Sequence, residues 1–290
     1  MSSLPKKNDD GNAVISHTQM NKFNMCPKAY EYRYVEGIKG IMPGRVKVGS
    51  AFDKAANFIN EERMLLKDAD PESAMHRAVE YMDDPGEEFD ETDIAADDNL
   101  LGRIDEAVRE YATTMNEVTV IASQKHVTRN IKDDVIIEGY IDTIEALPPH
   151  SEGEQVMITD NKTTLKKRSG KYTYDTATTD LQLSLYAWLY QPHADGALVS
   201  GKGWRVVDIG RKTPGRIEDV HVIDMNPDGT TNLTEEALLA TVNQMETACD
   251  TGLFAPLGRG TWLCSHAYCE FYNRCPYGSQ SQTTIPVGKF

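Results

Sequence analysis

The sequence predicts an α/β protein in which helices flank a mixed central sheet. Residues 135–147 alternate apolar and polar side chains as a half-buried strand does, a turn rich in Pro, Gly and Ser follows, and residues 155–163 are expected to form the next strand. An apolar helical pattern containing QLSLY follows, and two further strand patterns cover residues 196–209 and 217–225. Elements that alternate in this way predict a sheet of about five strands with helices on both faces.

Helical patterns dominate the first 115 residues and predict a helical elaboration before the sheet. Residues 19–34 place apolar side chains at helical spacing, and Cys26-Pro27 divides the segment in two because proline disrupts a helix interior. The remaining expected elements are a loop at 44–49, helices at 50–66, 72–83 and 100–115, a strand at 118–127, a turn at 226–231 and a last helix from 234 to about 250.

The composition is that of a soluble globular protein, with 40% hydrophobic and 26% charged residues among 290. No apolar run approaches the ~20 residues that a membrane-spanning helix needs. Residues 1–15 are polar and lack the apolar segment of a signal peptide, so we expect a disordered tail there. These features predict a cytoplasmic protein without a membrane partner.

The formal net charge of −15 opposes general binding of nucleic acid. Residues 83–98 contain nine acidic and no basic side chains, which is typical of a solvated insertion. Basic residues gather after the second strand, at Lys162, Lys166, Lys167, Arg168 and Lys171. Such a run is either a solvated loop or a phosphate contact, and its place directly after DNKT favours the contact.

Carboxylates and a lysine come together on the two central strands. Asp160 and Lys162 are two apart on a strand and therefore share a face, and Asp142 lies beside them if the strands are neighbours. Two carboxylates suit Mg²⁺ or Mn²⁺, and a lysine can orient a phosphate or a water, so the group suits metal-assisted phosphodiester hydrolysis. Gln182 and Tyr186 are four apart and lie on one face of the following helix.

In this order, Gly139–Asp142, Asp160–Thr163 and Gln182–Tyr186 resemble the G-x-x-D, (D/E)-x-K-T and Q-x-x-x-Y motifs of the PD-(D/E)XK nuclease superfamily, and within it of the RecB-type exonucleases. The resemblance implies a restriction-endonuclease-like core and a metal-dependent DNA exonuclease in recombination, repair or phage DNA metabolism. The site residues that it implies are Asp142 and Asp160 as metal ligands and the Asn161 carbonyl as a further ligand. Lys162 would position or activate the attacking water, and Gln182 and Tyr186 would orient the strand or support the site.

Relatives usually carry G-x-x-x-H at the start of an earlier helix, with the histidine as an extra metal ligand. This chain has Gly49 followed by Asp53 at the corresponding spacing. An aspartate binds Mg²⁺ or Mn²⁺ at least as well as a histidine does. Asp53 is therefore either a third metal ligand or a first-turn residue that complements the helix dipole.

Five cysteines in a chain of this kind are not expected to form disulfides. Cys26 and the C-terminal triplet Cys264, Cys269 and Cys275 resemble the [4Fe–4S] ligands of the AddB nuclease and of RecB-type exonucleases in CRISPR adaptation, where the cluster ties the two ends of the nuclease domain together. Four Cys or His ligands suit tetrahedral Zn²⁺ as well. Relatives often have two residues between the first two cysteines of the triplet, whereas this chain has four.

His266 stands where that closer spacing would place a ligand, so the fourth ligand is Cys264 or His266. Cys249 lies in the preceding helical pattern and is expected in the core.

The resemblance covers residues 16–276 as one nuclease domain, with the acidic insertion at 83–98, a cluster segment at 264–275 that pairs with Cys26, and a tail at 277–290. It implies DNA as a partner, and a helicase, a single-strand annealing protein or further copies of the chain as others. The alternative is a non-catalytic module on a nuclease fold, stapled by a metal cluster, that binds nucleic acid or protein. The net charge favours the module, whereas the intact carboxylate and lysine set favours the enzyme.

Overall fold

The computed structural model describes residues 2–86, 88–95, 97–148, 154–165, 171–194, 197–223, 235–257, 261–265 and 268–278. The chain divides into two compact units. We call Met42–Arg129 with Glu138–Glu235 the sheet unit, and Met1–Ile41 with Asn130–Ile137 and Glu236–Phe290 the terminal unit. The domain boundaries expected at residues 16 and 276 stay a prediction.

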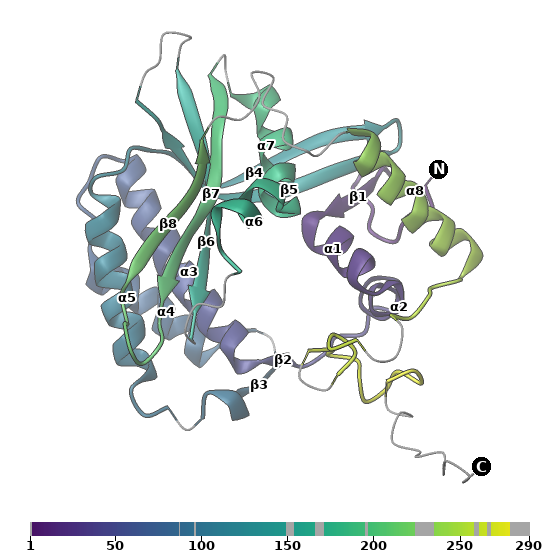
Figure 1. Ribbon diagram of the computed structural model, residues 1–290, viewed down its shortest axis with the longest axis horizontal. Coiled ribbons are helices and arrows are strands. Elements are labelled where there is room, and N and C mark those ends of the chain that lie inside the picture. Colours follow the sequence, from purple (N-terminus) through teal and green to yellow (C-terminus); the bar gives the residue numbers. More distant parts are fainter. Residues whose placement is uncertain are drawn as a thin grey trace. The chain divides into compact units, whose positions relative to one another are not determined.

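A mixed sheet forms the centre of the sheet unit (Figure 1). β6 (Gln155–Thr164) and β7 (Leu198–Asp208) run parallel, and β8 (Ile217–Ile223) pairs antiparallel with β7. Beside β6 lies β5 (Val135–Ala146), which is antiparallel to it, and β4 (Val120–Lys132) pairs with β5. The predicted α/β class with a mixed central sheet is confirmed.

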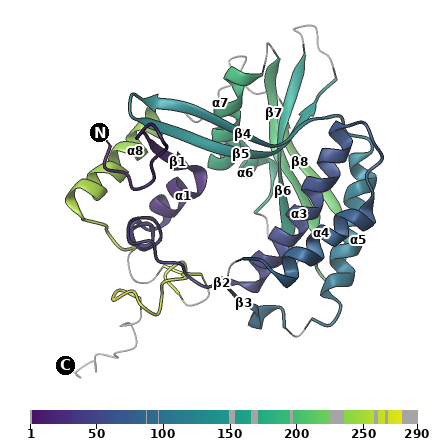
Figure 2. The ribbon, with the colours of Figure 1, turned by 180° about the vertical axis from the view of Figure 1, so that it is seen from behind.

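Helices cover both faces of this sheet (Figures 1 and 2). α6 (Tyr174–Thr179) and α7 (Leu181–Tyr190) form the crossover that parallel β6 and β7 require. α3 (Gly44–Met64), α4 (Pro71–Asp83) and α5 (Leu100–Met115) pack against one another on the opposite face. An apolar core forms on this side, and its bulky buried members include Phe52, Ile59, Ile104, Tyr111 and Met115.

Two buried cations lie on β7 and face opposite sides of the sheet. Arg205 is 1% exposed, and its guanidinium pairs with Glu145 at 2.9 Å and with Asp219 at 2.9 Å. Lys202 donates to the hydroxyl of Ser184 over 2.7 Å, and burial lowers the pKa of Lys202 to about 8. The Lys202 contact fixes α7 against β7 and thereby positions the polar residues that α7 carries.

The terminal unit begins with β1 (Ala13–Ser16) and α1 (His17–Met25). The side chain of Ser16 caps α1 and the helix ends before Cys26, so the predicted break is confirmed. After the break come α2 (Pro27–Tyr30) and a π-helical turn (Glu31–Val35), and the last helix is α8 (Glu235–Thr251). Within the expected N-terminal tail, the side chains of Leu4, Val14 and Ile15 are buried.

The expected loop at 44–49 was wrong, because α3 begins at Gly44, directly after Pro43. The reason is packing: Val48 is buried on α3, and Lys47 is buried with an ion pair to Glu91 at 2.5 Å. Part of the acidic stretch 83–98 is therefore held in place. It also contains β3 (Phe89–Asp90), which pairs with β2 (Met42–Pro43), and a 3₁₀ turn (Glu91–Asp93).

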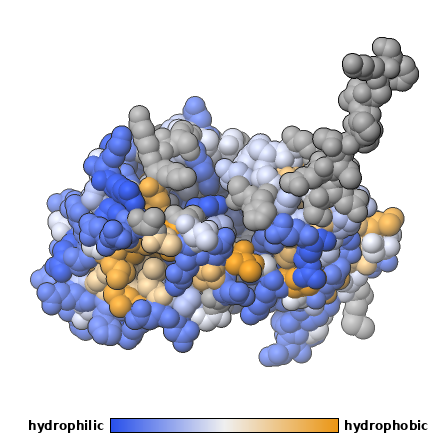
Figure 3. All heavy atoms as spheres, turned by 90° about the horizontal axis from the view of Figure 1, so that it is seen from below, coloured by the Kyte–Doolittle hydropathy of each residue, from blue (hydrophilic) through white to orange (hydrophobic). Residues whose placement is uncertain are grey.

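Seen from below, most of the coloured surface is hydrophilic, with hydrophobic residues in separate patches (Figure 3). None of the helices in the described ranges is long and apolar enough to span a membrane. Lys166, Lys167, Arg168, His266, the expected turn at 226–231 and most of the expected C-terminal tail lie outside the described residues.

Candidate active site

Asp142 and Asp160 come from neighbouring antiparallel strands. Thr143 of β5 stands opposite Thr159 of β6, and each aspartate is adjacent to one of these threonines on its own strand. The backbone N–H of Asn161 donates to Oδ2 of Asp142 over 3.0 Å. The structure therefore brings the two predicted carboxylates to one place, with Asp142 held by the backbone of the adjacent strand.

Lys162, Gln182 and Tyr186 join Asp160 in one hydrogen-bonded chain. The ammonium of Lys162 lies 2.5 Å from Oδ2 of Asp160 and donates to Oε1 of Gln182 over 3.1 Å. The amide nitrogen of Gln182 is 2.8 Å from Oδ1 of Asp160 and 3.2 Å from the hydroxyl of Tyr186. The spacing of two on β6 and of four on α7 thus aims all four side chains at one point.

Asp53 lies in the middle of α3, and the charges of Asp142, Asp160 and Lys162 act on its carboxylate. The alternative that placed Asp53 in the first turn of its helix is wrong, because α3 starts nine residues earlier, at Gly44. Three carboxylates and one ammonium therefore share the site.

Burial dominates the electrostatics of these groups. It raises the pKa of Asp160 to about 7, although the Lys162 ammonium acts in the opposite direction. Burial also raises the pKa of Asp142, and burial together with the Asp142 charge raises that of Asp53. For Lys162, burial lowers the pKa, but the Asp160 and Asp142 charges outweigh it and the pKa is raised.

The chemistry of these donors suits a divalent cation. The site offers three carboxylates as hard oxygen ligands, and a cation would offset the negative charge that Lys162 alone does not neutralise. Oδ2 of Asp160 is buried and, apart from the Lys162 ion pair, has no hydrogen-bond partner among the described residues. The described His, Cys, Asp and Glu side chains nevertheless form no group of three placed to hold a metal ion.

The sequence of the chain matches the family model of the PD-(D/E)XK nuclease superfamily over residues 14–276, which is most of the chain. The chain belongs to this superfamily. PD-(D/E)XK nucleases generally use Mg²⁺ or Mn²⁺.

Two solved structures are similar to the chain at low identity. One is the crystal structure of SSO0001, with 14% identity, a TM-score of 0.43, and coverage of 94% of this chain and 89% of that one. The other is that of a candidate exonuclease from Eubacterium rectale, with 13% identity, a TM-score of 0.49, and coverage of 84% of each chain. No curated protein matches the chain.

A layer of polar side chains, which the sequence did not predict, supports the motif residues of this PD-(D/E)XK superfamily member through hydrogen bonds. Gln124 of β4 donates its amide both to Oδ1 of Asp142, over 3.1 Å, and to Oδ1 of Asn57, over 3.0 Å. Its φ of +47° is left-handed, a strained conformation for a residue other than glycine. A glutamine in a strand carries no signal of this role in the sequence.

A second part of this layer joins α3 and α5 to β5 and β6. The amide of Asn60 donates to the hydroxyl of Thr143 over 3.0 Å, and the Tyr111 hydroxyl reaches Oδ1 of Asn60 at 3.1 Å and Oδ1 of Asn161 at 3.4 Å. These bonds tie the two helices to the strands that carry Asp142 and Asp160. They help to fix the position of the carboxylates from the side of α3 and α5.

A cavity of about 580 Å³ opens beside the site, and Gln124 and Asn57 form part of its wall. Its two aromatic side chains, Phe58 and Tyr81, each have a cation about 5.9 Å from the ring, Arg77 and Lys54 respectively. The remaining lining residues are acidic: Glu61, Glu80 and Asp84.

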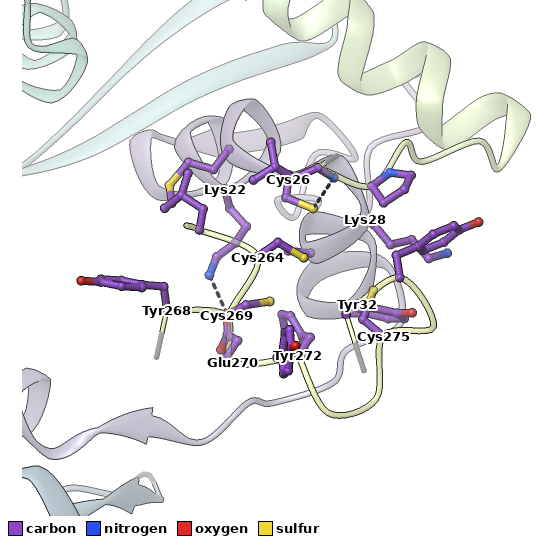
Figure 4. Close-up of a pocket in the computed structure, with 18 residues that line it drawn as sticks. Lys22, Cys26, Lys28, Tyr32, Cys264, Tyr268, Cys269, Glu270, Tyr272 and Cys275 are labelled. Carbon is purple, nitrogen blue, oxygen red and sulfur yellow. Dashed lines mark hydrogen bonds and ion pairs between the residues drawn. The ribbon is translucent and has the colours of Figure 1, made fainter. Parts of the chain in front are cut away.

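In the terminal unit, the four predicted cysteines line a single cavity (Figure 4). Cys26 comes from the α1–α2 break, and Cys264, Cys269 and Cys275 come from the C-terminal segment. Burial raises the pKa of the Cys269 thiol, and the other three cysteines act on it in the same direction. The structure thus gathers the distant cysteine and the triplet, and Cys249 of α8 is not among the residues that line this cavity.

Proposed function

We propose that this chain is a metal-dependent DNA exonuclease of the RecB-like group, acting in the cytoplasm in recombination, repair or phage DNA metabolism. The observation that carries the proposal is the convergence of Asp53, Asp142 and Asp160 with Lys162 and its Gln182 partner. Three carboxylates around one ammonium are costly to bury, and a site that binds a divalent cation and a phosphate has a use for all of them.

Each residue has a definite role in this proposal. Asp53, Asp142 and Asp160 would hold Mg²⁺ or Mn²⁺, with the Asn161 carbonyl as a further ligand. The ion, when bound, polarises the phosphate and lowers the pKa of a water.

Lys162, fixed between Asp160 and Gln182, holds the attacking water or a phosphate oxygen at a defined distance from the carboxylates. Gln182 and Tyr186 keep Asp160 and Lys162 oriented. The P–O bond to the departing nucleotide breaks as the water oxygen bonds to phosphorus. The proton of the water passes to solvent or to a phosphate oxygen, and the leaving oxygen takes a proton from solvent.

We also propose that Cys26, Cys264, Cys269 and Cys275 hold a [4Fe–4S] cluster, with Zn²⁺ as the competing ligand. Four cysteines around one cavity are the usual ligand set for either. His266 is the alternative to Cys264. A cluster here would close a loop from residue 26 to the C-terminal segment, and a clip across a long loop removes much entropy from the unfolded chain.

The test is digestion of end-labelled linear DNA, single- and double-stranded, by anaerobically purified protein with Mg²⁺, Mn²⁺ or EDTA. We expect metal-dependent release of nucleotides from the ends, lost in Lys162→Ala. Lys67→Ala is the matched control, because Lys67 is exposed and pairs with Glu62 at 3.7 Å. Cleavage that survives in Lys162→Ala at the wild-type rate would refute the site.

The second candidate is a non-catalytic module that binds nucleic acid or protein. The net charge of −15 favours the form of this module that binds protein, because an acidic chain repels the phosphate backbone. Protein that carries its full complement of metal, binds DNA or a partner, and cleaves neither strand form would support the module. A helicase, a single-strand annealing protein and further copies of the chain are the partners that we propose for either form.

A further inference from the structure

We propose that His126 and Tyr140 form a stacking platform for an unpaired base of the substrate, and that the enzyme therefore prefers single-stranded DNA ends. The inference rests on the proposed nuclease function and adds to it a substrate class and two residues. The juxtaposition that carries it is an exposed pair of stacked rings beside a candidate catalytic aspartate.

The two rings lie face to face across the β4–β5 strand pair. Their centroids are 4.5 Å apart and their planes differ by 21°. Tyr140 is 54% exposed, and the side chain of His126 is 46% exposed. The imidazole is held by Glu138, whose carboxylate lies 3.3 Å from Nε2. The pair is thus ordered by its partners and accessible at the same time.

The platform stands next to the catalytic group. Tyr140 and Asp142 are two apart on β5, so they share a face and are separated by roughly 6.6 Å along the strand. On β4, His126 follows Gln124 at the same spacing, and Gln124 is bonded to Asp142. A strand that places a phosphate at Asp142 therefore brings an adjacent base within reach of the rings.

An unpaired base is the ligand that suits these groups. Every base has a flat face that can stack on an aromatic ring, and such a contact contributes about 1–3 kcal/mol per base without requiring a particular sequence. Bases inside a duplex are already stacked and paired, so they cannot reach a ring on a flat strand surface unless the end opens.

The net charge of the chain also favours an unpaired base as the ligand. With a net charge of −15, the protein gains little from phosphate neutralisation, which is the usual source of affinity for duplex DNA. Glu138 beside His126 would also repel a phosphate but not a neutral base. Stacking supplies affinity that does not depend on positive charge.

The structural alternative is a cross-strand pair that only stabilises the sheet, worth about 0.2–1 kcal/mol. The structural pair and the platform predict different effects of substitutions at Tyr140 and His126. A structural pair affects the melting temperature and both strand forms equally, whereas a platform affects binding and cleavage of unpaired ends.

The experiment compares Tyr140→Ala, Tyr140→Phe and His126→Ala with the control His76→Ala. The side chain of His76 is 75% exposed and pairs with Glu80 at 3.3 Å, the same distance as the His126–Glu138 pair. Initial rates with Mn²⁺ are measured on a single-stranded oligonucleotide and on the blunt duplex of the same sequence. Binding is measured in the Lys162→Ala background, from the fluorescence of an oligonucleotide that carries 2-aminopurine near its end.

We expect Tyr140→Ala to lower kcat/KM on the single strand by about 5- to 150-fold, the equivalent of one stacked base. The loss on the duplex should be several-fold smaller. Wild-type Tyr140 should quench 2-aminopurine on binding, Tyr140→Ala should abolish the quenching, and Tyr140→Phe should restore it because the ring is kept. His126→Ala should weaken binding, and His76→Ala should not.

Equal losses on single strand and duplex, or a Phe variant as poor as the Ala variant, would overturn the platform and leave the nuclease standing. So would single-strand kinetics that do not change in Tyr140→Ala. If the wild type cleaves neither substrate, the nuclease proposal fails. Quenching that depends on Tyr140 would still establish the platform in that case, and its absence would overturn both.

Discussion

The backbone N–H of Asn161 donates a hydrogen bond of 3.0 Å to Oδ2 of Asp142. It joins β6 to the carboxylate of the adjacent strand directly beyond the pairing of Thr143 with Thr159. Because the donor is a backbone group, this bond does not depend on the side chain at position 161. The other oxygen of Asp142 depends on a side chain, the amide of Gln124.

Gln124→Ala should therefore weaken metal binding without unfolding the protein. The amide of Gln124 lowers the pKa of Asp142 against the effect of burial, so its loss raises that pKa and frees one carboxylate oxygen. Loss of such a supporting bond costs about 10- to 100-fold in metal affinity or activity. Cleavage measured against Mn²⁺ concentration should show a higher half-saturating value, and the optimum should move to higher pH.

The matched control is Gln155→Ala, a change on β6 at a glutamine that hydrogen-bonds Ser200 at 3.2 Å, away from the carboxylates. An unchanged Mn²⁺ dependence in Gln124→Ala would show that Gln124 does not position Asp142.

In the absence of metal, stability should fall as the pH rises. Burial raises the pKa of Asp160 from the ordinary 3.8 to about 7, so the folded state binds a proton between these values that the unfolded state has lost. The contribution of this group is therefore fully present below about pH 4 and is lost as the pH rises through about 7. The raised pKa values of Asp53 and Asp142 act in the same direction.

The measurement is the melting temperature in EDTA between about pH 5 and about pH 8. Asp160→Asn should flatten the profile, because the amide does not titrate, and Mn²⁺ should restore stability at the alkaline end for the wild type alone. A wild-type melting temperature in EDTA that rises over this range more steeply than that of Asp160→Asn would mean that burial does not raise the pKa of Asp160.

The motif side chains of the site could be predicted because local geometry places them. A spacing of two on a strand puts Asp160 and Lys162 on one face, and a spacing of four on a helix does the same for Gln182 and Tyr186. Polarity alternation likewise predicted β5, a strand was expected at 155–163 where β6 lies, and α5 was expected at 100–115, where the structure has it.

The supporting residues could not be predicted, since their contacts are set by tertiary packing. Asn60 meets Thr143 across 83 positions of the chain, and no local pattern records that contact. Gln124 has a left-handed φ that its own propensity opposes, and its two hydrogen-bond partners are distant in the sequence. The start of α3 was missed for a similar reason: Gly44 is a poor helix former, but burial of Val48 favours the helix.

Gly139→Ala should disturb the site by displacing Tyr186 of α7. A Cβ at this position would lie 2.8 Å from Cε1 of Tyr186 and 3.0 Å from Cδ1 of Leu189, so the Tyr186 ring must move. Overpacking of this kind costs about 1–3 kcal/mol. The displaced ring also draws its hydroxyl away from Gln182. We expect a lower urea midpoint together with a lower kcat.

Gly201→Ala on β7 is the control for this change, because the nearest atom to its new Cβ is Cγ of Met157 at 3.2 Å, on a flexible side chain. Gly139→Ala with wild-type stability and rate would mean that the close approach to Tyr186 is not required.

A substitution in the cysteine cavity tests the proposed cluster. Cys269→Ser should remove visible absorbance, iron and acid-labile sulfide from anaerobically purified protein. It should also lower the free energy of unfolding by about 2–5 kcal/mol, by analogy with the loss of a native cross-link. Cys249→Ser is the matched control, since burial raises the pKa of its thiol to about 11 and it lies outside the cavity.

The metal content of the wild type separates the alternatives. Suppose the wild type is colourless and carries one zinc per chain, which Cys269→Ser loses and Cys249→Ser keeps. This result would show that the cavity holds zinc in place of a cluster, and the ligand assignment would stand. His266→Ala and Cys264→Ser then decide the fourth ligand, because only the true ligand should release the metal. Equal metal content in Cys269→Ser and the wild type would remove the cavity as a metal site altogether.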